Sequence, residues 1–176
     1  MSDERRSPGR ILLFTGDGKG KTSAALGLGL RALGHDLRVS VIQFIKSRRD
    51  VGEVEAAQRL GDRFEILPCG RGFVTEPGGT PEDRAAARAG LELAREKAAD
   101  CDVLILDEVH EAIRLGLFDA GDVLGLLRGK PAGLHVVLTG RGAPDELIDA
   151  ADTVTEMANV KHAFDAGTDA AEGIEF

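Results

Sequence analysis

A short apolar run, a glycine-rich turn and a helical pattern together constrain this chain more than any other feature. Residues 11–14 are four consecutive apolar side chains, a pattern typical of a buried strand, and residues 15–22 read Thr-Gly-Asp-Gly-Lys-Gly-Lys-Thr. Leucines and alanines then recur from Ala24 to Leu33, before Gly34. A strand that runs through such a loop into a helix starting at Lys-Thr is the setting of a phosphate-binding P-loop. We therefore expect a polyphosphate site at this point of an α/β fold.

This loop is a variant of the usual P-loop pattern. Glycines let backbone N–H groups approach phosphate oxygens without a Cβ clash, and the helix N-terminus adds partial positive charge. Lys21 supplies a full charge, and the Thr22 hydroxyl can bind Mg²⁺. The usual first glycine is replaced by Thr15, while Gly18 and Lys19 add a glycine and a cation. The residues predicted to bind the nucleotide here are Gly16, Asp17, Gly18, Lys19, Gly20, Lys21, Thr22 and Ser23. A glycine-rich turn that binds nothing is the alternative.

Composition points to one ordinary globular domain. The chain has 176 residues, of which 43% are hydrophobic and 30% charged, and its net charge is −8. Such an acidic balance argues against broad nucleic-acid binding. Cys69 and Cys101 are far apart, so we expect free thiols in a reducing compartment. No run approaches a membrane span or a signal peptide, which favours a cytoplasmic enzyme with no membrane partner.

Strand and helix patterns alternate along the rest of the chain. Residues 1–10 are expected to be a flexible lead-in, and residues 11–176 a single domain whose last segment wraps over the sheet. Further strands are predicted at 37–44, 63–67, 102–106, 134–139 and 153–157, and helices at 51–60, 80–99, 119–127 and 144–151. This alternation predicts a parallel sheet with helices on both faces, in the manner of P-loop proteins.

A second motif follows the apolar strand that ends before Asp107. Paired acids at Asp107 and Glu108 downstream of a P-loop form a Walker B arrangement, in which carboxylates hold or position Mg²⁺. We predict Thr22, Asp107 and Glu108 as the metal site; acids that merely favour a helix N-terminus are the alternative. The string Asp-Glu-Val-His also resembles a helicase box, but the chain is too short for two motor domains and is acidic. His110 is therefore predicted to be an ordinary helix residue.

Three further residues, at strand ends or in a loop, are candidates for contacts with a ligand. Lys46 lies where phosphates bind beyond a parallel strand, but a solvated loop lysine is equally consistent. Arg141, flanked by glycines after a strand, favours a phosphate or ribose contact. Phe73 lies in a glycine-rich loop at 68–80, where it either covers a flat ligand or packs into the core.

Taken together, these motifs resemble the ATP:corrinoid adenosyltransferases, a family of RecA-like P-loop fold that acts in cobalamin biosynthesis and salvage. The resembling segments are TGDGKGKTSAALG at 15–27, VIQFIK at 41–46, GF at 72–73, LILDE at 104–108, LTGRGAP at 138–144, LIDAADTVTEM at 147–157 and VKHAFDAG with GIEF at 160–176. They cover nearly the whole chain after residue 10.

The resemblance implies a transferase in which Co(I) of a corrinoid attacks C5′ of ATP and expels triphosphate. Lys19 and Lys21 would neutralise the triphosphate, and Glu108 would act with Thr22 on Mg²⁺, supported by Asp107. Lys19, Lys21 and Glu108 are thus the predicted catalytic residues, and Arg31 matches a family position near the nucleotide. The corrinoid would lie over the loop carrying Phe73.

Partners are implied by the same resemblance. The substrate would be cobyrinic acid a,c-diamide, cobinamide or cobalamin, a reductase or flavoprotein would donate electrons, and the protein would form a homodimer. Thr75 stands where the family often has Trp, and residues 1–10 are shorter than the leading segment of some relatives. A P-loop ATPase or small-molecule kinase, and a nucleotide sensor without turnover, are the competing hypotheses.

Overall fold

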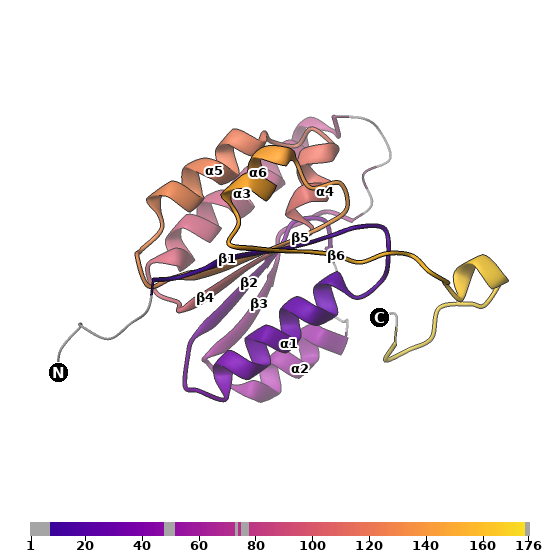
Figure 1. The fold of residues 1–176 in the computed structure, drawn as a ribbon, viewed down its shortest axis with the longest axis horizontal. Coiled ribbons are helices and arrows are strands. Elements are labelled where there is room, and N and C mark those ends of the chain that lie inside the picture. Colours follow the sequence, from indigo (N-terminus) through magenta and orange to yellow (C-terminus); the bar gives the residue numbers. More distant parts are fainter. Residues whose placement is uncertain (1–7, 48–51, 73, 75–77, 175–176) are drawn as a thin grey trace.

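A six-stranded parallel sheet forms the centre of the protein (Figure 1). The computed structural model describes residues 8–47, 52–72, 74 and 78–174. The strands lie in the order β3-β2-β4-β5-β1-β6. Their bounds are β1 Ile11–Thr15, β2 Val39–Gln43, β3 Phe64–Pro68, β4 Val103–Asp107, β5 His135–Thr139 and β6 Thr153–Glu156. Each expected strand is present, although the second is shorter than its apolar pattern because residues 37–38 precede the ladder.

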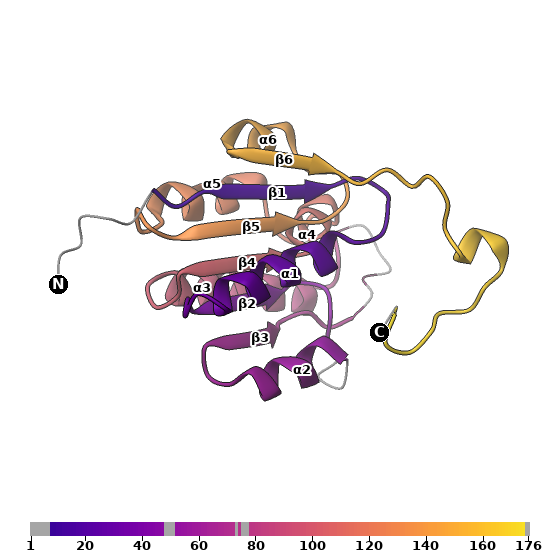
Figure 2. The same cartoon turned by 60° about the horizontal axis from the view of Figure 1, so that its bottom comes forward.

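Helices cover both faces of this sheet, as predicted from the alternating pattern (Figures 1 and 2). Helices α1 and α2 lie on one face, and α3 to α6 lie on the other. Their bounds are α1 Lys21–Leu33, α2 Gly52–Leu60, α3 Pro81–Ala98, α4 Val109–Arg114, α5 Ala120–Gly129 and α6 Asp145–Ala150. The start of α3 was predicted from its cap, and Thr80 and Asp83 do form a reciprocal capping box there.

Alternate side chains of the inner strands enter two separate cores. On β1, Leu13 packs in the cluster beneath α3 and α5, whereas Phe14 packs with the helices on the opposite face. On β4, Leu104 and Ile105 divide in the same way. Strands buried on both faces are mostly apolar, which is why the inner strands could be predicted from the sequence. The two cores fix the sheet, and with it the edge where the strands end.

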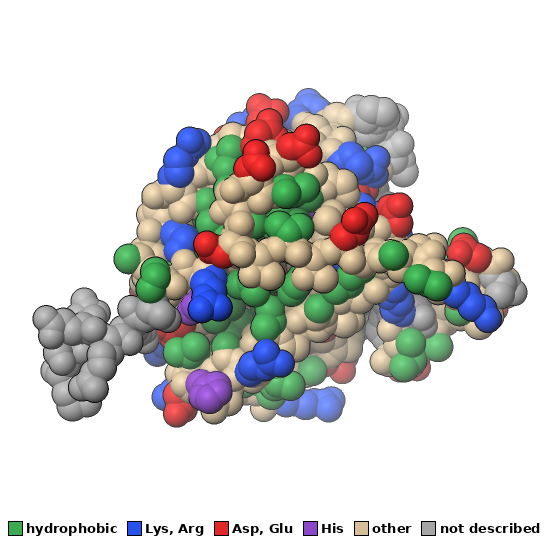
Figure 3. Space-filling view, viewed as in Figure 1, with side chains coloured by type: hydrophobic (Ala, Val, Ile, Leu, Met, Phe, Trp, Pro, Cys, Tyr) green, Lys and Arg blue, Asp and Glu red, His purple; other side chains and the backbone are tan. Residues whose placement is uncertain are grey.

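The segment after β6 was expected to wrap over the sheet. In the structure it runs outward from β6 (Figures 1 and 2). Residues 158–165 and 167–174 are exposed, apart from the half-buried His162. Hydrophobic side chains are visible along it (Figure 3). Its far end returns to the P-loop, where Lys19 Nζ donates to the Ile174 carbonyl at 3.0 Å. Within the described residues, no helix has the length and apolar character needed to cross a membrane.

Candidate nucleotide-binding site

The P-loop connects β1 to α1 in a conformation that needs its glycines. Gly16 and Gly20 have φ values of 92° and 117°, which L side chains rarely adopt. Gly18 donates its N–H to the Met157 carbonyl at 2.7 Å, and a Cβ on Gly18 would lie 2.6 Å from the Ala158 carbonyl oxygen. The loop is therefore pressed against the end of β6, so its unusual glycine spacing has a local steric reason.

Lys21 is the central cation of this loop. Its ammonium donates to the carbonyls of Gly16 and Gly18, both at 2.6 Å, so the side chain folds back across the loop. Burial and the neighbouring Arg141 lower the pKa of Lys21, and Asp17 and Glu108 oppose that shift. A polyanion bound in the loop would stabilise the charged ammonium, which is the electrostatic demand of a phosphate site.

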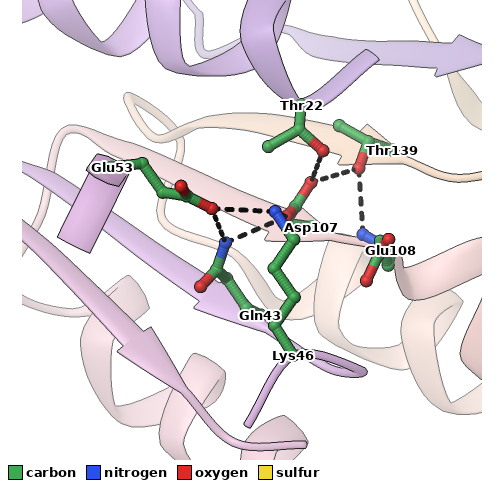
Figure 4. Close-up of polar contacts among 7 residues, drawn as sticks. All are labelled: Thr22, Gln43, Lys46, Glu53, Asp107, Glu108 and Thr139. Carbon is green, nitrogen blue, oxygen red and sulfur yellow. Dashed lines mark hydrogen bonds and ion pairs between the residues drawn. The ribbon is translucent and has the colours of Figure 1, made fainter. Parts of the chain in front are cut away.

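Asp107 is the hub of a polar network at the ends of three neighbouring strands (Figure 4). Its Oδ1 accepts hydrogen bonds from the hydroxyls of Thr22 at 2.7 Å and Thr139 at 2.8 Å, and its Oδ2 accepts from Gln43 Nε2 at 3.2 Å. The carboxylate is fully buried. Asp107 thus holds the Thr22 hydroxyl in place at the start of α1.

Lys46 joins this network from the loop after β2. Its ammonium donates to Glu53 Oε1 at 2.8 Å and lies 3.8 Å from Asp107 Oδ2 (Figure 4). Burial acts to lower the pKa of Lys46, but the carboxylates of Asp107 and Glu53 outweigh it and raise that pKa. Lys46 is therefore a half-buried, charged residue that lies beside the Walker B acids, and it is not the solvated loop lysine that the sequence also allowed.

Glu108 is held in a conformation unusual for a residue with a side chain. Its φ is 60°, its backbone N–H donates to Thr139 Oγ1 at 2.9 Å, and its Oε2 is buried without a hydrogen-bond partner. Burial, with Asp107 next to it, raises the pKa of Glu108 to about 7. Within the described residues no donor reaches this oxygen, so it is available to a bound cation or to a donor on a ligand.

The donor set fits Mg²⁺ bound together with phosphates. Thr22 and Glu108 offer a hydroxyl and a carboxylate, which are the oxygen ligands that Mg²⁺ prefers. In the part of the chain that the structure describes, no group of three or more His, Cys, Asp or Glu residues could hold a metal ion by itself. This agrees with Mg²⁺ chemistry, since that ion takes few protein ligands and completes its shell with water and substrate phosphates.

A cavity of about 590 Å³ opens beside this network at the carboxyl edge of the sheet. Most of the predicted site residues line it, namely Gly18, Lys19, Gly20, Lys21, Thr22, Ser23, Glu108 and Arg141. Gly16 and Asp107 support the cavity from behind, through Lys21 and Thr22 respectively. Asp17 is exposed in the P-loop. The P-loop and Walker B predictions thus converge on one place.

Arg31 is not brought to this cavity, and Phe73 is not described by the structure. Arg31 lies in the last turn of α1, about 15 Å along the helix from Lys21 at 1.5 Å per residue, and it is absent from the cavity lining. Phe73, predicted to contact a corrinoid or to enter the core, lies outside the described residues. The neighbouring Val74 packs partly buried against the core.

Several residues that the structure places at the site were not predicted from the sequence. Thr139 and Glu53 complete the Asp107 network, and His162 from the C-terminal segment lines the cavity.

His110 is a helix residue, as predicted: it is buried at the start of α4, and its Nδ1 lies 3.1 Å from the Gly140 carbonyl. Burial lowers the pKa of His110 to about 4, so its ring is neutral and Nδ1 donates this hydrogen bond. His110 therefore ties α4 to the turn that carries Arg141.

Solved structures with the same fold confirm the RecA-like P-loop class. A KaiC-like protein from Pyrococcus horikoshii matches 86% of this chain and 73% of its own with a TM-score of 0.60 at 18% identity. The flagellar accessory protein FlaH from Methanocaldococcus jannaschii matches 85% and 71% with a TM-score of 0.58 at 12% identity. At such identities the likeness establishes the fold alone.

Sequence relatives place the chain more narrowly. A corrinoid adenosyltransferase from Pseudomonas aeruginosa is 44% identical over 178 residues, covering 100% of this chain and 88% of the relative. The corrinoid adenosyltransferase CobA from Salmonella typhimurium is 38% identical, covering 100% of this chain and 90% of the relative. Residues 7–176 match the family model described as ATP:corrinoid adenosyltransferase BtuR/CobO/CobP. The chain therefore belongs to the ATP:corrinoid adenosyltransferase family.

Proposed function

We infer that this protein transfers the 5′-deoxyadenosyl group of ATP to the cobalt of a corrinoid, in cobalamin metabolism. The observation that carries this conclusion is the family match over residues 7–176, because it includes both the variant P-loop and the C-terminal segment. The cation-lined cavity at the P-loop supports it by offering a place for the triphosphate. The corrinoid is a substrate that brings its own cobalt.

The chemistry sets the task of the protein residues. Co(I) supplies the electron pair of the new cobalt–carbon bond, the C5′–oxygen bond breaks, and its electron pair leaves with triphosphate. Cobalt is thereby oxidised from Co(I) to Co(III). Negative charge develops on the leaving oxygen in the transition state, so preorganised donors around the triphosphate lower the barrier. A base that activates water is not required.

We assign that stabilisation to the P-loop and its neighbours. The backbone N–H groups from Gly16 to Ser23 would bind phosphate oxygens, while Lys19 and Lys21 would neutralise the leaving group. Arg141 would reach the nucleotide from the turn after β5, where it lines the same cavity. These roles are supported by the convergence of the cations on one cavity, and each can be tested by substitution.

Mg²⁺ completes the proposed site. Thr22 and Glu108 would hold the ion with the phosphates, and Asp107 would orient Thr22 through the 2.7 Å hydrogen bond between them. When bound, the ion would supply positive charge next to the departing triphosphate. The buried, unpartnered Oε2 of Glu108 is the structural support for this part of the proposal.

The corrinoid and the cellular partners complete the proposal. We place the corrinoid over the 68–80 loop, with cobyrinic acid a,c-diamide, cobinamide or cobalamin as the substrate class. Because the reaction needs Co(I), a reductase or flavoprotein would supply electrons. A homodimer in the cytoplasm is the expected state.

An anaerobic assay tests this function directly. The purified protein is mixed with ATP, Mg²⁺ and a chemically reduced corrinoid, and the visible spectrum is followed for loss of Co(I). We expect a light-sensitive adenosylcorrinoid and one triphosphate for each corrinoid consumed. Release of ADP and orthophosphate with an unchanged Co(I) spectrum would refute the transferase and favour an ATPase or kinase.

A further inference from the structure

We propose that Lys46 is a triphosphate-binding residue of this enzyme and that Glu53 positions it. The proposal rests on the proposed function, because triphosphate is the leaving group of that reaction. It adds to the cavity a phosphate contact that comes from outside the P-loop motif. Neither residue belongs to the P-loop or the Walker B pair, and only Lys46 lies in a segment that resembles the family.

The first support is the position of the ammonium group. Lys46 lines the same cavity as Lys21, Thr22 and Arg141, but it enters from the loop after β2 rather than from the P-loop. β2 and β4 are paired so that Gln43 lies opposite Asp107. The chain beyond Gln43 therefore emerges beside the Walker B acids, where phosphates bind in a parallel α/β sheet.

The second support is the hydrogen-bonding capacity left on Lys46. An ammonium has three donors, and among the described residues Glu53 Oε1 at 2.8 Å is its hydrogen-bond acceptor. Asp107 Oδ2, at 3.8 Å, is within ion-pair distance but too far for a hydrogen bond. Among the described residues, two donors thus remain for a ligand in the cavity.

Glu53 holds Lys46 in this place. It lies in the first turn of α2, whose Val54 and Ala57 are buried in the core under β3. Its Oε1 also accepts a weaker contact from Gln43 Nε2 at 3.4 Å, so the carboxylate is fixed from two sides (Figure 4). A flexible lysine is thereby held at one point of the cavity wall, which reduces the entropy lost when a polyanion binds.

The chain offers a matched control pair outside the cavity. Lys97 Nζ donates to Glu65 at 2.8 Å, and the side chains are 30% and 35% exposed, compared with 32% and 19% for Lys46 and Glu53. Neither Lys97 nor Glu65 lines the nucleotide cavity. Substitutions in this pair therefore report the cost of losing a half-buried ion pair without touching a ligand.

The experiment measures binding of inorganic tripolyphosphate and of ATP, with Mg²⁺, by calorimetry. Lys46→Met is expected to weaken both by about tenfold to hundredfold, the range of a lost charge-assisted hydrogen bond. Lys97→Met should leave both unchanged, and Lys46→Arg should recover most of the affinity. Lys46→Gln keeps a donor for Glu53 but lacks the charge, so it should lose affinity even if Lys46→Met folds poorly.

Glu53→Gln tests the positioning role separately. Because Lys46 keeps its charge in that variant but loses the partner that fixes it, the tripolyphosphate affinity should fall several-fold, less than in Lys46→Met, and kcat should fall several-fold as well. An unchanged kcat would refute the role of Glu53. Wild-type affinity for tripolyphosphate in both Lys46→Met and Lys46→Gln would refute the role of Lys46. A wild-type protein that binds tripolyphosphate but forms no adenosylcorrinoid would instead refute the proposed function and leave Lys46 as a polyphosphate-binding residue.

Discussion

Two substitutions of Asp107 should separate the cost of leaving buried donors without an acceptor from the cost of losing the negative charge. Asp107→Leu removes the acceptor shared by Thr22, Thr139 and Gln43 while keeping a similar volume. Three donors then lose this acceptor; Gln43 and Thr139 are buried, and each unsatisfied buried group costs about 1–3 kcal/mol. Relief from burying a carboxylate offsets part of this sum. We expect a net loss of about 3–5 kcal/mol in the free energy of unfolding.

Asp107→Asn should be much milder, for a specific structural reason. Among the described residues, the buried Oε1 of Gln43 has no hydrogen-bond partner. If the Gln43 amide rotates by half a turn, that oxygen can accept from the new Asn amide, and the two threonine hydroxyls can still donate to the Asn oxygen. The rotation gives up the 3.4 Å contact from Gln43 to Glu53. The loss should therefore be about 1 kcal/mol, close to that of one neutral hydrogen bond.

Urea unfolding at pH 7 measures both variants, with Asp36→Asn as the control. Asp36 pairs with Arg63 at 2.7 Å on the surface, and such exposed pairs contribute less than about 1 kcal/mol. The expected order of loss is Asp107→Leu, then Asp107→Asn, then Asp36→Asn. A loss for Asp107→Asn as large as that for Asp107→Leu would refute the amide rotation, and wild-type stability of Asp107→Leu would refute the network as a structural element.

Two further predictions concern single residues of the site. Glu108 has a folded pKa of about 7, above the ordinary 4.5, so the folded chain binds more protons than the unfolded chain between these values and stability falls as pH rises from 4.5 to 7. With a chelator present, Glu108→Gln should therefore have a free energy of unfolding up to about 3 kcal/mol higher than wild type at pH 8 and nearly equal to it at pH 4. An equal effect at both pH values in denaturant unfolding would contradict this. Gly140→Ala should destabilise by at least about 2 kcal/mol, because φ is 140° and its Cβ would lie 2.8 Å from the Cβ of His110. Gly125→Ala is the control, because Gly125 lies in the middle of α5 and the nearest atom to its added Cβ is 4.0 Å away. It should stabilise by about 0.5–1 kcal/mol in the same denaturation assay, and a loss of stability would contradict the steric explanation.

The sequence predicted the motifs because each is local. A P-loop is read from eight consecutive residues, and a buried strand ending in Asp107-Glu108 is read from seven. The sheet, the helices on both faces and the capped start of α3 follow from patterns within single elements. Helix α4 was not delimited because its six residues are too few for a helical period and no proline or side-chain cap marks its start, whereas Pro144 marks the equally short α6.

The remaining site residues depend on the order of strands, which no local pattern contains. Gln43 lies opposite Asp107 in the β2–β4 register, and Thr139 follows Leu138, which pairs with Leu106. β2, β4 and β5 are neighbours only because the chain crosses over between them. Arg31 was predicted from the resemblance alone. It lies at the far end of α1 and does not line the cavity.

The arrangement of charges favours a departing triphosphate over an attacked one. Attack on a terminal phosphate needs charge concentrated at one end of the chain of phosphates and a residue that positions the nucleophile there. In this cavity the cations come from separate elements: Lys19 and Lys21 from the P-loop, Lys46 from the loop after β2, and Arg141 from the turn after β5. A triphosphate that leaves as a unit gains from positive charge along its whole length. Asp107 connects two of these walls, since it holds Thr22 at the P-loop and lies 3.8 Å from Lys46, so one buried carboxylate sets the spacing between the groups that would contact the leaving group.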